Sequence, residues 1–265
     1  MMNEFDFMQR YQGLKDMRFS AMASEFKEQY ENWEEHNYSS EERIFRLIDA
    51  ETEVRRNKKF NRLLKASGLR YRNASMNSEL FEAEGVDRSL LEKLSEGSWL
   101  ERAENLLITG KTGAGKSYCA RALAVAAMSK SKKVRYFKAS ELLRILLNAE
   151  AKMELIDEIN SLSKVDLLIV DDFGLMRLDI EMCRNLFDLI DVRDGRKSNL
   201  FISQFPVCDW YELFKDNTFA DACLDRLTGG AHRLEFLGES YRKKKNEKRK
   251  NEPAKAGKTN RSELR

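Results

Sequence analysis

The sequence has little that would crosslink, stiffen or anchor the chain. Its 265 residues include two prolines, two histidines and four cysteines, and no two cysteines form a C-x-x-C pair. A disulfide framework or a zinc site is therefore not expected, and the cysteines are predicted to be small buried side chains. The scarcity of proline leaves room for long helices. The apolar runs are too short for a transmembrane helix, and the acidic N-terminus does not resemble a signal peptide, so we predict a cytoplasmic protein.

Charge of one sign is concentrated in two places. The whole chain carries 47 Lys+Arg against 44 Asp+Glu, a net charge of +3. Residues 54–72 hold eight basic and no acidic side chains, and residues 242–265 hold eleven basic and three acidic ones. The rest of the chain is therefore net acidic. Such asymmetry predicts local patches that bind a polyanion.

The N-terminal part, residues 1–72, is predicted to be a helical domain for DNA binding or oligomerisation. A long helix is expected after Ser39, which forms the S-x-x-E capping box with Glu42, and Gly68 is a plausible stop. Its second half carries six basic side chains: Arg55, Arg56, Lys58, Lys59, Arg62 and Lys65. Solvated helix faces usually mix signs, so this run favours contacts to DNA phosphates. We see no base-reading motif, and expect binding to duplex DNA that is largely independent of sequence.

Residues 73–103 are predicted to be a linker that contains a helix at Ser89–Leu94, and residues 104–242 an α/β domain. Five short apolar strands are expected at residues 105–109, 134–137, 166–170, 199–203 and 233–237, with helices between them. This alternation is typical of a parallel five-stranded sheet with flanking helices. Residues 243–265 are predicted to be a basic, disordered tail. Its positive charge does not by itself indicate a function.

A phosphate-binding motif, G-x-x-x-x-G-K-[ST], follows the first expected strand and opens a helix. It consists of Gly110, Lys111, Thr112, Gly113, Ala114, Gly115, Lys116 and Ser117, and we include the next residue, Tyr118, in the nucleotide site. The glycines let successive backbone N–H groups point at phosphate, and the helix N-terminus adds its positive dipole end. Lys116 is expected to reach the β- and γ-phosphates of ATP, and Ser117 to bind Mg²⁺.

Two carboxylates end the third expected strand. Asp171 is predicted to hold Mg²⁺ and Asp172 to polarise the attacking water, as in a Walker B motif. Asp172 is shorter than the glutamate common at this position, so we expect slow or partner-stimulated ATP hydrolysis. Gln204 ends the next strand, where its side chain either contacts the γ-phosphate or serves only in the turn. Arg226 and Arg242 are either surface charges or neutralise γ-phosphate charge, in cis or from a neighbouring subunit.

These motifs occur together and in an order that resembles the IstB family of transposition helper ATPases. The likeness rests on the Walker A motif, on Leu-Leu-Ile-Val-Asp-Asp-Phe-Gly, and on the later Asp-Trp-Tyr-Glu-Leu-Phe, Leu-Asp-Arg-Leu and Gly-Glu-Ser-Tyr-Arg segments. An upstream helix with Glu-Glu-Arg, Asp-Ala-Glu and Arg-Arg-Asn-Lys-Lys completes it. The family is related to the DnaC and DnaI helicase loaders of the AAA+ superfamily, and the upstream helix favours IstB. The likeness covers about residues 8–250.

The resemblance implies more than the residues alone. It implies an AAA+ sheet with strand order 5-1-4-3-2, and a homo-oligomer on DNA with ATP at subunit interfaces. Arg226 then falls at the position of the trans arginine finger, Arg242 at sensor 2, and Gln204 at sensor 1, where asparagine is usual. The implied partner is an IstA-type transposase that the ATPase delivers to target DNA. A replicative helicase loader, or a nucleotide-gated adaptor with negligible turnover, remains as an alternative.

Overall fold

A computed structural model describes residues 3–35, 37–69, 74–76 and 86–238 of the chain. It divides into two compact units, and the division falls between Lys65 and Ala66. The predicted tail and Arg242 lie outside the described residues, as does much of the predicted linker.

The first unit is helical, as the sequence predicts. Its helices are α1 (Glu4–Asp16), α2 (Ser20–Glu31) and α3 (Ser40–Ala66). The buried Phe7 of α1 stacks on Tyr30 of α2, with ring centroids 4.0 Å apart. The predicted capping box is confirmed: the Ser39 backbone N–H donates to the Glu42 carboxylate at 2.7 Å, and the Glu42 N–H donates to the Ser39 hydroxyl at 3.2 Å. The capping box therefore sets the start of the long helix.

One acidic residue of α3 ties this helix to α2 and, through Arg55, to the connection between α1 and α2. Glu51 accepts hydrogen bonds from the backbone N–H groups of Ala21 (3.0 Å) and Met22 (3.2 Å), which lie in the first turn of α2. Its other carboxylate oxygen pairs with Arg55 Nε at 2.7 Å, and Arg55 also donates to the carbonyl of Arg18 at 3.1 Å. The Arg55 guanidinium and these N–H groups hold the pKa of Glu51 below its usual value near 4.5.

The exchange Glu51→Gln is expected to lower the free energy of unfolding of the helical unit by about 1–2 kcal/mol at pH 7, because a charged cap and an ion pair are lost. The pKa of Glu51 is lower in the folded chain, so its stabilisation is complete above about pH 4.5 and disappears as the pH falls through the folded-state value. Thermal unfolding followed by circular dichroism at pH 7 and pH 3 measures this. Glu53→Gln, at an exposed position two residues on, is the matched control. Equal losses in the two variants at pH 7 would contradict the assignment.

The second unit contains a parallel five-stranded sheet within the described residues, with strand order β2-β3-β4-β1-β5. The strands are β1 (Leu106–Gly110), β2 (Val134–Lys138), β3 (Leu167–Phe173), β4 (Ser198–Ser203) and β5 (His232–Phe236). The five predicted strands are confirmed within a few residues at each end, and so is the order that the family resemblance implied. The main difference is β3, which continues through both of its terminal carboxylates to Phe173.

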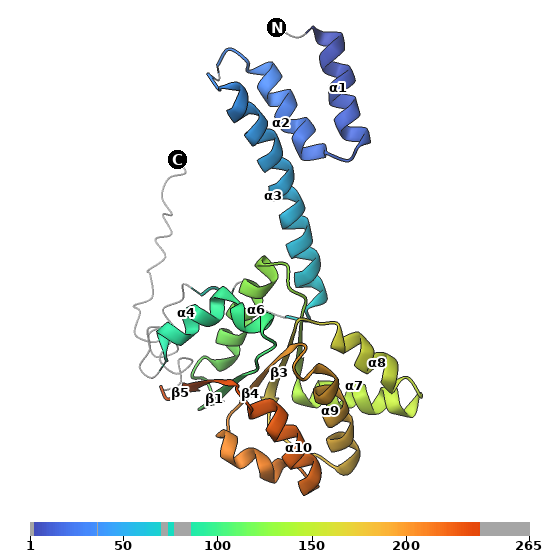
Figure 1. The fold of residues 1–265 in the computed structure, drawn as a ribbon, viewed down its shortest axis with the longest axis vertical. Helices are drawn as coiled ribbons and strands as arrows, with labels where there is room; N and C mark the ends of the chain where they lie inside the picture. The colour runs from blue at the N-terminus through green and yellow to red at the C-terminus, as the bar shows by residue number, and fades with distance from the viewer. Residues whose placement is uncertain (1–2, 36, 70–73, 77–85, 239–265) are drawn as a thin grey trace, which may run out of the picture. The chain divides into compact units, whose positions relative to one another are not determined.

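Helices cover both faces of this sheet (Figure 1). They are α4 (Arg88–Glu96), α5 (Ser98–Glu101), α6 (Lys116–Ser129), α7 (Ala139–Ala151), α8 (Leu155–Ser163), α9 (Ile180–Arg193), the 3₁₀ helix η2 (Val207–Leu213) and α10 (Asn217–Thr228). Helix α6 packs on one face, and α7, α9 and α10 share a buried apolar core with the other. Alternate residues of each strand therefore face different layers. Phe137 and Val170, for example, point into the apolar core shared with α7, α9 and α10, which we call the α9 core.

Two further features differ from the sequence expectations. The segment predicted as a linker contains the expected helix, α4, but also α5, whose Trp99 is 1% exposed and donates its indole N–H to the Leu94 carbonyl at 2.9 Å. Cys119, Cys183 and Cys223 are buried as expected, but Cys208 is exposed because it lies on the surface helix η2. Among the described residues, we find no helix with the length and apolar character needed to cross a membrane.

Candidate nucleotide site

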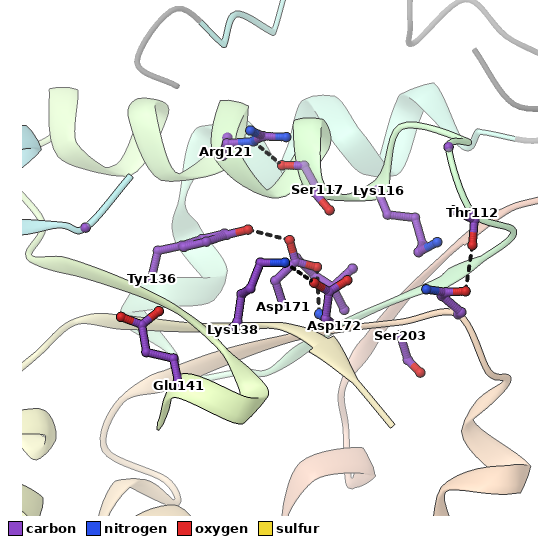
Figure 2. A pocket seen from close by; sticks show the side chains of 14 residues that line it. Thr112, Lys116, Ser117, Arg121, Tyr136, Lys138, Glu141, Asp171, Asp172 and Ser203 are labelled. Atoms are coloured by element: carbon purple, nitrogen blue, oxygen red, sulfur yellow. Dashed lines mark hydrogen bonds and ion pairs between the residues drawn. The ribbon is translucent and has the colours of Figure 1, made fainter. Parts of the chain in front are cut away.

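The predicted phosphate-binding residues and the two strand-end carboxylates meet in one cavity of about 360 Å³ (Figure 2). It lies at the carboxyl ends of β1, β2, β3 and β4, where parallel sheets place their ligands. Its lining residues are Gly68, Thr112, Gly113, Lys116, Ser117, Arg121, Tyr136, Lys138, Glu141, Asp171, Asp172, Ile202, Ser203 and Gln204. Predicted residues from Walker A, Walker B and the end of β4 are thus brought together.

The three glycines of the loop meet different requirements. Gly113 and Gly115 have φ angles of 82° and 109°, which side chains with a Cβ rarely adopt. Gly110 has φ 133°, and a Cβ there would lie 2.2 Å from the carbonyl oxygen of Phe236. The first glycine is therefore required by the neighbouring strand β5, in addition to any contact with phosphate.

Lys116 and Ser117 open helix α6, and their polar atoms lie in the cavity. Lys116 Nζ donates to the carbonyl oxygens of Gly110 (2.6 Å) and Lys111 (2.9 Å), so the loop curls around its ammonium group. Because α6 begins here, its first backbone N–H groups and its dipole also face the cavity. This combination suits a polyphosphate.

Gln204 reaches across the cavity to the same loop. Its side-chain oxygen accepts a hydrogen bond from the Thr112 hydroxyl at 2.6 Å. The amide comes from the residue directly after β4 and thereby joins the central strand to the phosphate loop. A phosphate group bound at this loop would therefore lie close to the Gln204 side chain.

A register shift in β3 turns both carboxylates toward the cavity. Pairing between β3 and β4 is regular to Val170 and resumes at Phe173, and both of these side chains enter the α9 core. Regular alternation would send Asp172 into that core, but its φ of 60° places it beside Asp171. Aspartate tolerates this left-handed backbone better than most residues, which gives a physical reason for the short acid here.

Strand β2 supplies partners for both carboxylates, and sequence reasoning missed them. The Tyr136 hydroxyl donates to Asp171 Oδ2, and Lys138 Nζ pairs with Asp172 Oδ2 at 2.7 Å. The Asp171 Oδ1 atom accepts the Asp172 backbone N–H at 2.8 Å. Burial, with the nearby Asp171 charge, raises the pKa of Tyr136, so its hydroxyl stays protonated and donates. These two residues could have been predicted from the sequence, because they end the strand that the family resemblance places beside β3.

The donor set suits Mg²⁺ in company with phosphates. Asp171 is 3% exposed and lines the cavity together with the Ser117 hydroxyl, and both offer the hard oxygen ligands that Mg²⁺ prefers. Within the described part of the chain, no group of three or more His, Cys, Asp or Glu side chains could hold a metal ion alone. Mg²⁺ usually binds one or two carboxylates and completes its shell with phosphate oxygens and water, which fits this small set of protein ligands.

Other predicted residues lie apart from the cavity lining. Gly110, Lys111, Ala114 and Gly115 shape the loop behind it, and the Tyr118 hydroxyl accepts a hydrogen bond from the backbone N–H of Ser75 at 3.1 Å. Tyr118 therefore contacts the chain that follows the helical unit.

Arg226, on α10, is held on its own subunit away from the cavity. Its guanidinium pairs with Asp191 of α9 at 2.8 Å and lies over the Phe187 ring, 4.8 Å from the centroid. Its backbone carbonyl accepts a hydrogen bond from the Asn105 side chain at 2.9 Å, which fixes the end of α10 against β1. Arg226 is therefore not among the residues that line this cavity.

The six basic side chains predicted to bind DNA lie on α3, and all are exposed. Arg55 differs from the rest because it is engaged by Glu51, as described above. At 100° per residue, Arg55, Lys58, Lys59, Arg62 and Lys65 fall within one third of the helix circumference. They form the basic face of α3.

The sequence is similar to a known protein family over most of its length. The family model described as IstB-like ATP binding protein matches residues 12–249. An insertion sequence ATP-binding protein of Sinorhizobium fredii is 37% identical over 237 residues, covering 87% of this chain and 93% of the relative. The insertion sequence IS1162 ATP-binding protein of Pseudomonas fluorescens is 34% identical over 195 residues, covering 73% and 84%.

The fold of the second unit is shared with solved AAA+ proteins. The crystal structure of the DnaC helicase loader matches with a TM-score of 0.54 and 16% identity, covering 63% of this chain and 98% of the loader. At that identity the likeness concerns the fold alone.

Proposed function

The chain belongs to the family of IstB-like ATP-binding proteins, and we propose that it is a DNA-binding AAA+ ATPase that helps a partner transposase select and engage target DNA. The observation that carries this proposal is the convergence of Lys116, Ser117, Asp171, Asp172 and Gln204 in one cavity. The family supports ATP as the nucleotide. ATP hydrolysis, DNA binding and the transposase partner are the parts of this proposal that go beyond membership of the family.

For ATP hydrolysis, each cavity residue takes a separate task. Lys116 would leave the loop carbonyls for the β- and γ-phosphates, and Ser117 and Asp171 would hold Mg²⁺. Bound Mg²⁺ would neutralise phosphate charge that builds up during transfer. Asp172 would polarise the attacking water, and Gln204 would contact the γ-phosphate or that water.

The ion pair between Lys138 and Asp172 supports slow hydrolysis. Asp172 Oδ2 pairs with Lys138 Nζ at 2.7 Å, and the positive charge of this lysine makes the carboxylate a weaker acceptor for the proton of the attacking water. The same observation supports the second candidate, a nucleotide-gated adaptor with little turnover. Measurement of ATP hydrolysis with and without duplex DNA separates the two.

Sequence identity and coverage favour a transposition role over helicase loading. The two insertion-sequence relatives are 34% and 37% identical across most of this chain, whereas DnaC, at 16%, shares the fold. The relatives are named for insertion sequences, which supports an IstA-type transposase as the partner. A homo-oligomer with ATP between subunits would bring Arg226 of one subunit to the cavity of the next.

Duplex DNA is proposed to bind the basic face of α3. Its side chains project into solvent, and none of the residues from 54 to 65 is acidic. Such contacts neutralise backbone phosphates and release counterions, so the affinity should fall steeply with salt and vary little with sequence.

Replacing Lys58, Lys59, Arg62 and Lys65 together by alanine is expected to weaken duplex binding at least about tenfold, and to reduce the slope of log affinity against log salt by about 3 to 4. Arg55 is left in place because it supports Glu51. Fluorescence anisotropy of labelled DNA at several salt concentrations measures both quantities.

The control for this variant carries the same change in net charge elsewhere. Lys27, Lys164, Arg196 and Lys215 are exposed basic residues outside the basic face. Their replacement by alanine should leave the salt slope nearly unchanged. An equal reduction in slope for both quadruple variants would remove the DNA assignment from α3.

A further inference from the structure

We propose that Tyr136 is a positioning residue for Mg²⁺, because its phenol orients the metal-binding carboxylate of Asp171. The proposal rests on the proposed ATP and Mg²⁺ site and adds to it a residue from a different strand. Neither the Walker A nor the Walker B motif contains Tyr136.

The orientation of Tyr136 follows from the sheet. Strand β2 pairs in parallel with β3, with Tyr136 opposite Ile169 and Lys138 opposite Asp171. Phe137 enters the α9 core, so its neighbours Tyr136 and Lys138 face the other side, where the cavity lies. Figure 2 shows the phenol reaching along the cavity wall to the carboxylate.

Both oxygens of Asp171 have a fixed donor. Oδ2 accepts from the Tyr136 hydroxyl, and Oδ1 accepts the Asp172 backbone N–H at 2.8 Å. Each carboxylate oxygen has two lone pairs, so one on each oxygen stays available for a metal ion or its water. Two donors on one buried carboxylate set both its position and its rotation before any metal arrives.

Pre-orientation of this kind lowers the cost of metal binding. Hydrogen-bond partners of metal ligands hold the ligand in its binding geometry, and their removal typically reduces metal affinity about 10- to 100-fold. The backbone donor to Oδ1 lies in the left-handed turn at Asp172, and it remains when the tyrosine is changed. Tyr136 is therefore the part of this arrangement that a side-chain substitution tests cleanly.

The exchange Tyr136→Phe removes the hydroxyl and keeps the ring that forms the wall. Binding of a fluorescent N-methylanthraniloyl ATP is measured in EDTA and then against MgCl₂. We expect unchanged affinity in EDTA and a Mg²⁺ requirement raised about tenfold or more. Tyr211→Phe, on the exposed η2, is the matched control and should keep the normal Mg²⁺ requirement. Thermal unfolding of each variant reports whether the fold is retained.

A double-variant cycle shows whether Tyr136 acts through Asp171. In the Asp171→Asn background, Tyr136→Phe should add no further change in the Mg²⁺ requirement, because the carboxylate that it orients is gone. This comparison remains informative if the single variant is somewhat less stable.

The outcomes separate the two proposals. An unchanged Mg²⁺ requirement in Tyr136→Phe overturns the inference, as does an equal loss of affinity in EDTA, which would make the residue only a wall of the cavity. If the unaltered protein binds the nucleotide under neither condition, the proposed nucleotide function fails instead.

Discussion

Replacing Arg226 by alanine is expected to leave ATP binding intact and to lower ATP hydrolysis by about a thousandfold, within the range measured for arginine fingers. The reason is its location. The guanidinium lies outside its own cavity, paired with Asp191 at 2.8 Å on a face formed by α9 and α10. In the proposed oligomer, an arginine placed there would stabilise γ-phosphate charge in the cavity of the neighbouring subunit. Steady-state hydrolysis and nucleotide binding, measured on the same preparation, separate the two effects.

Mixing variants tests the shared site. The Arg226→Ala protein keeps an intact cavity, and an Asp172→Asn protein keeps an intact arginine. Interfaces that combine the two should hydrolyse ATP, so a mixture should be more active than either protein alone. Arg184→Ala, on the same surface helix α9, is a control that should stay fully active. No gain on mixing would argue that Arg226 is a structural partner of Asp191.

Replacing Lys116 by alanine is expected to weaken ATP binding at least about a hundredfold, because charge-assisted hydrogen bonds to the phosphates are lost. The Lys116 side chain is 7% exposed and lies between the loop carbonyls and the two carboxylates of β3. Isothermal titration calorimetry with ATP measures the change.

The control for Lys116 is Lys215→Ala, an exposed position outside the cavity, which should bind ATP normally. Thermal unfolding should show that Lys116→Ala retains its fold, since its two acceptors are carbonyls of a loop that water can reach. Normal ATP affinity in Lys116→Ala would mean that the nucleotide binds elsewhere.

Local sequence signals predicted most of the fold. Alternating apolar strands, the Walker A motif and the Ser39–Glu42 capping box each depend on neighbours within a few residues, so their elements were expected nearly in place. Helix α8 was missed although Leu155, Ile159 and Leu162 follow helical spacing, because the segment is short and no side chain caps its start. The strand order is a non-local property, and it came from the family resemblance.

The site was predictable where its residues belong to one motif and unpredictable where strands meet. The pairing of Tyr136 and Lys138 with the carboxylates depends on β2 lying beside β3, over 30 residues away. The turn that presents Asp172 to the cavity depends on a register shift that no periodicity signals. Likewise, the charge count on α3 could not show that Arg55 serves Glu51.

The most direct test of the account is the rate of ATP hydrolysis by the full chain as duplex DNA is added. The proposed function predicts slow turnover without DNA and a rise that saturates with DNA. It also predicts that Lys116→Ala abolishes turnover at every DNA concentration, and that the quadruple alanine variant of the basic face shifts the rise to higher DNA. Turnover that DNA does not change, or that survives in Lys116→Ala, would contradict an ATPase controlled by DNA at this site.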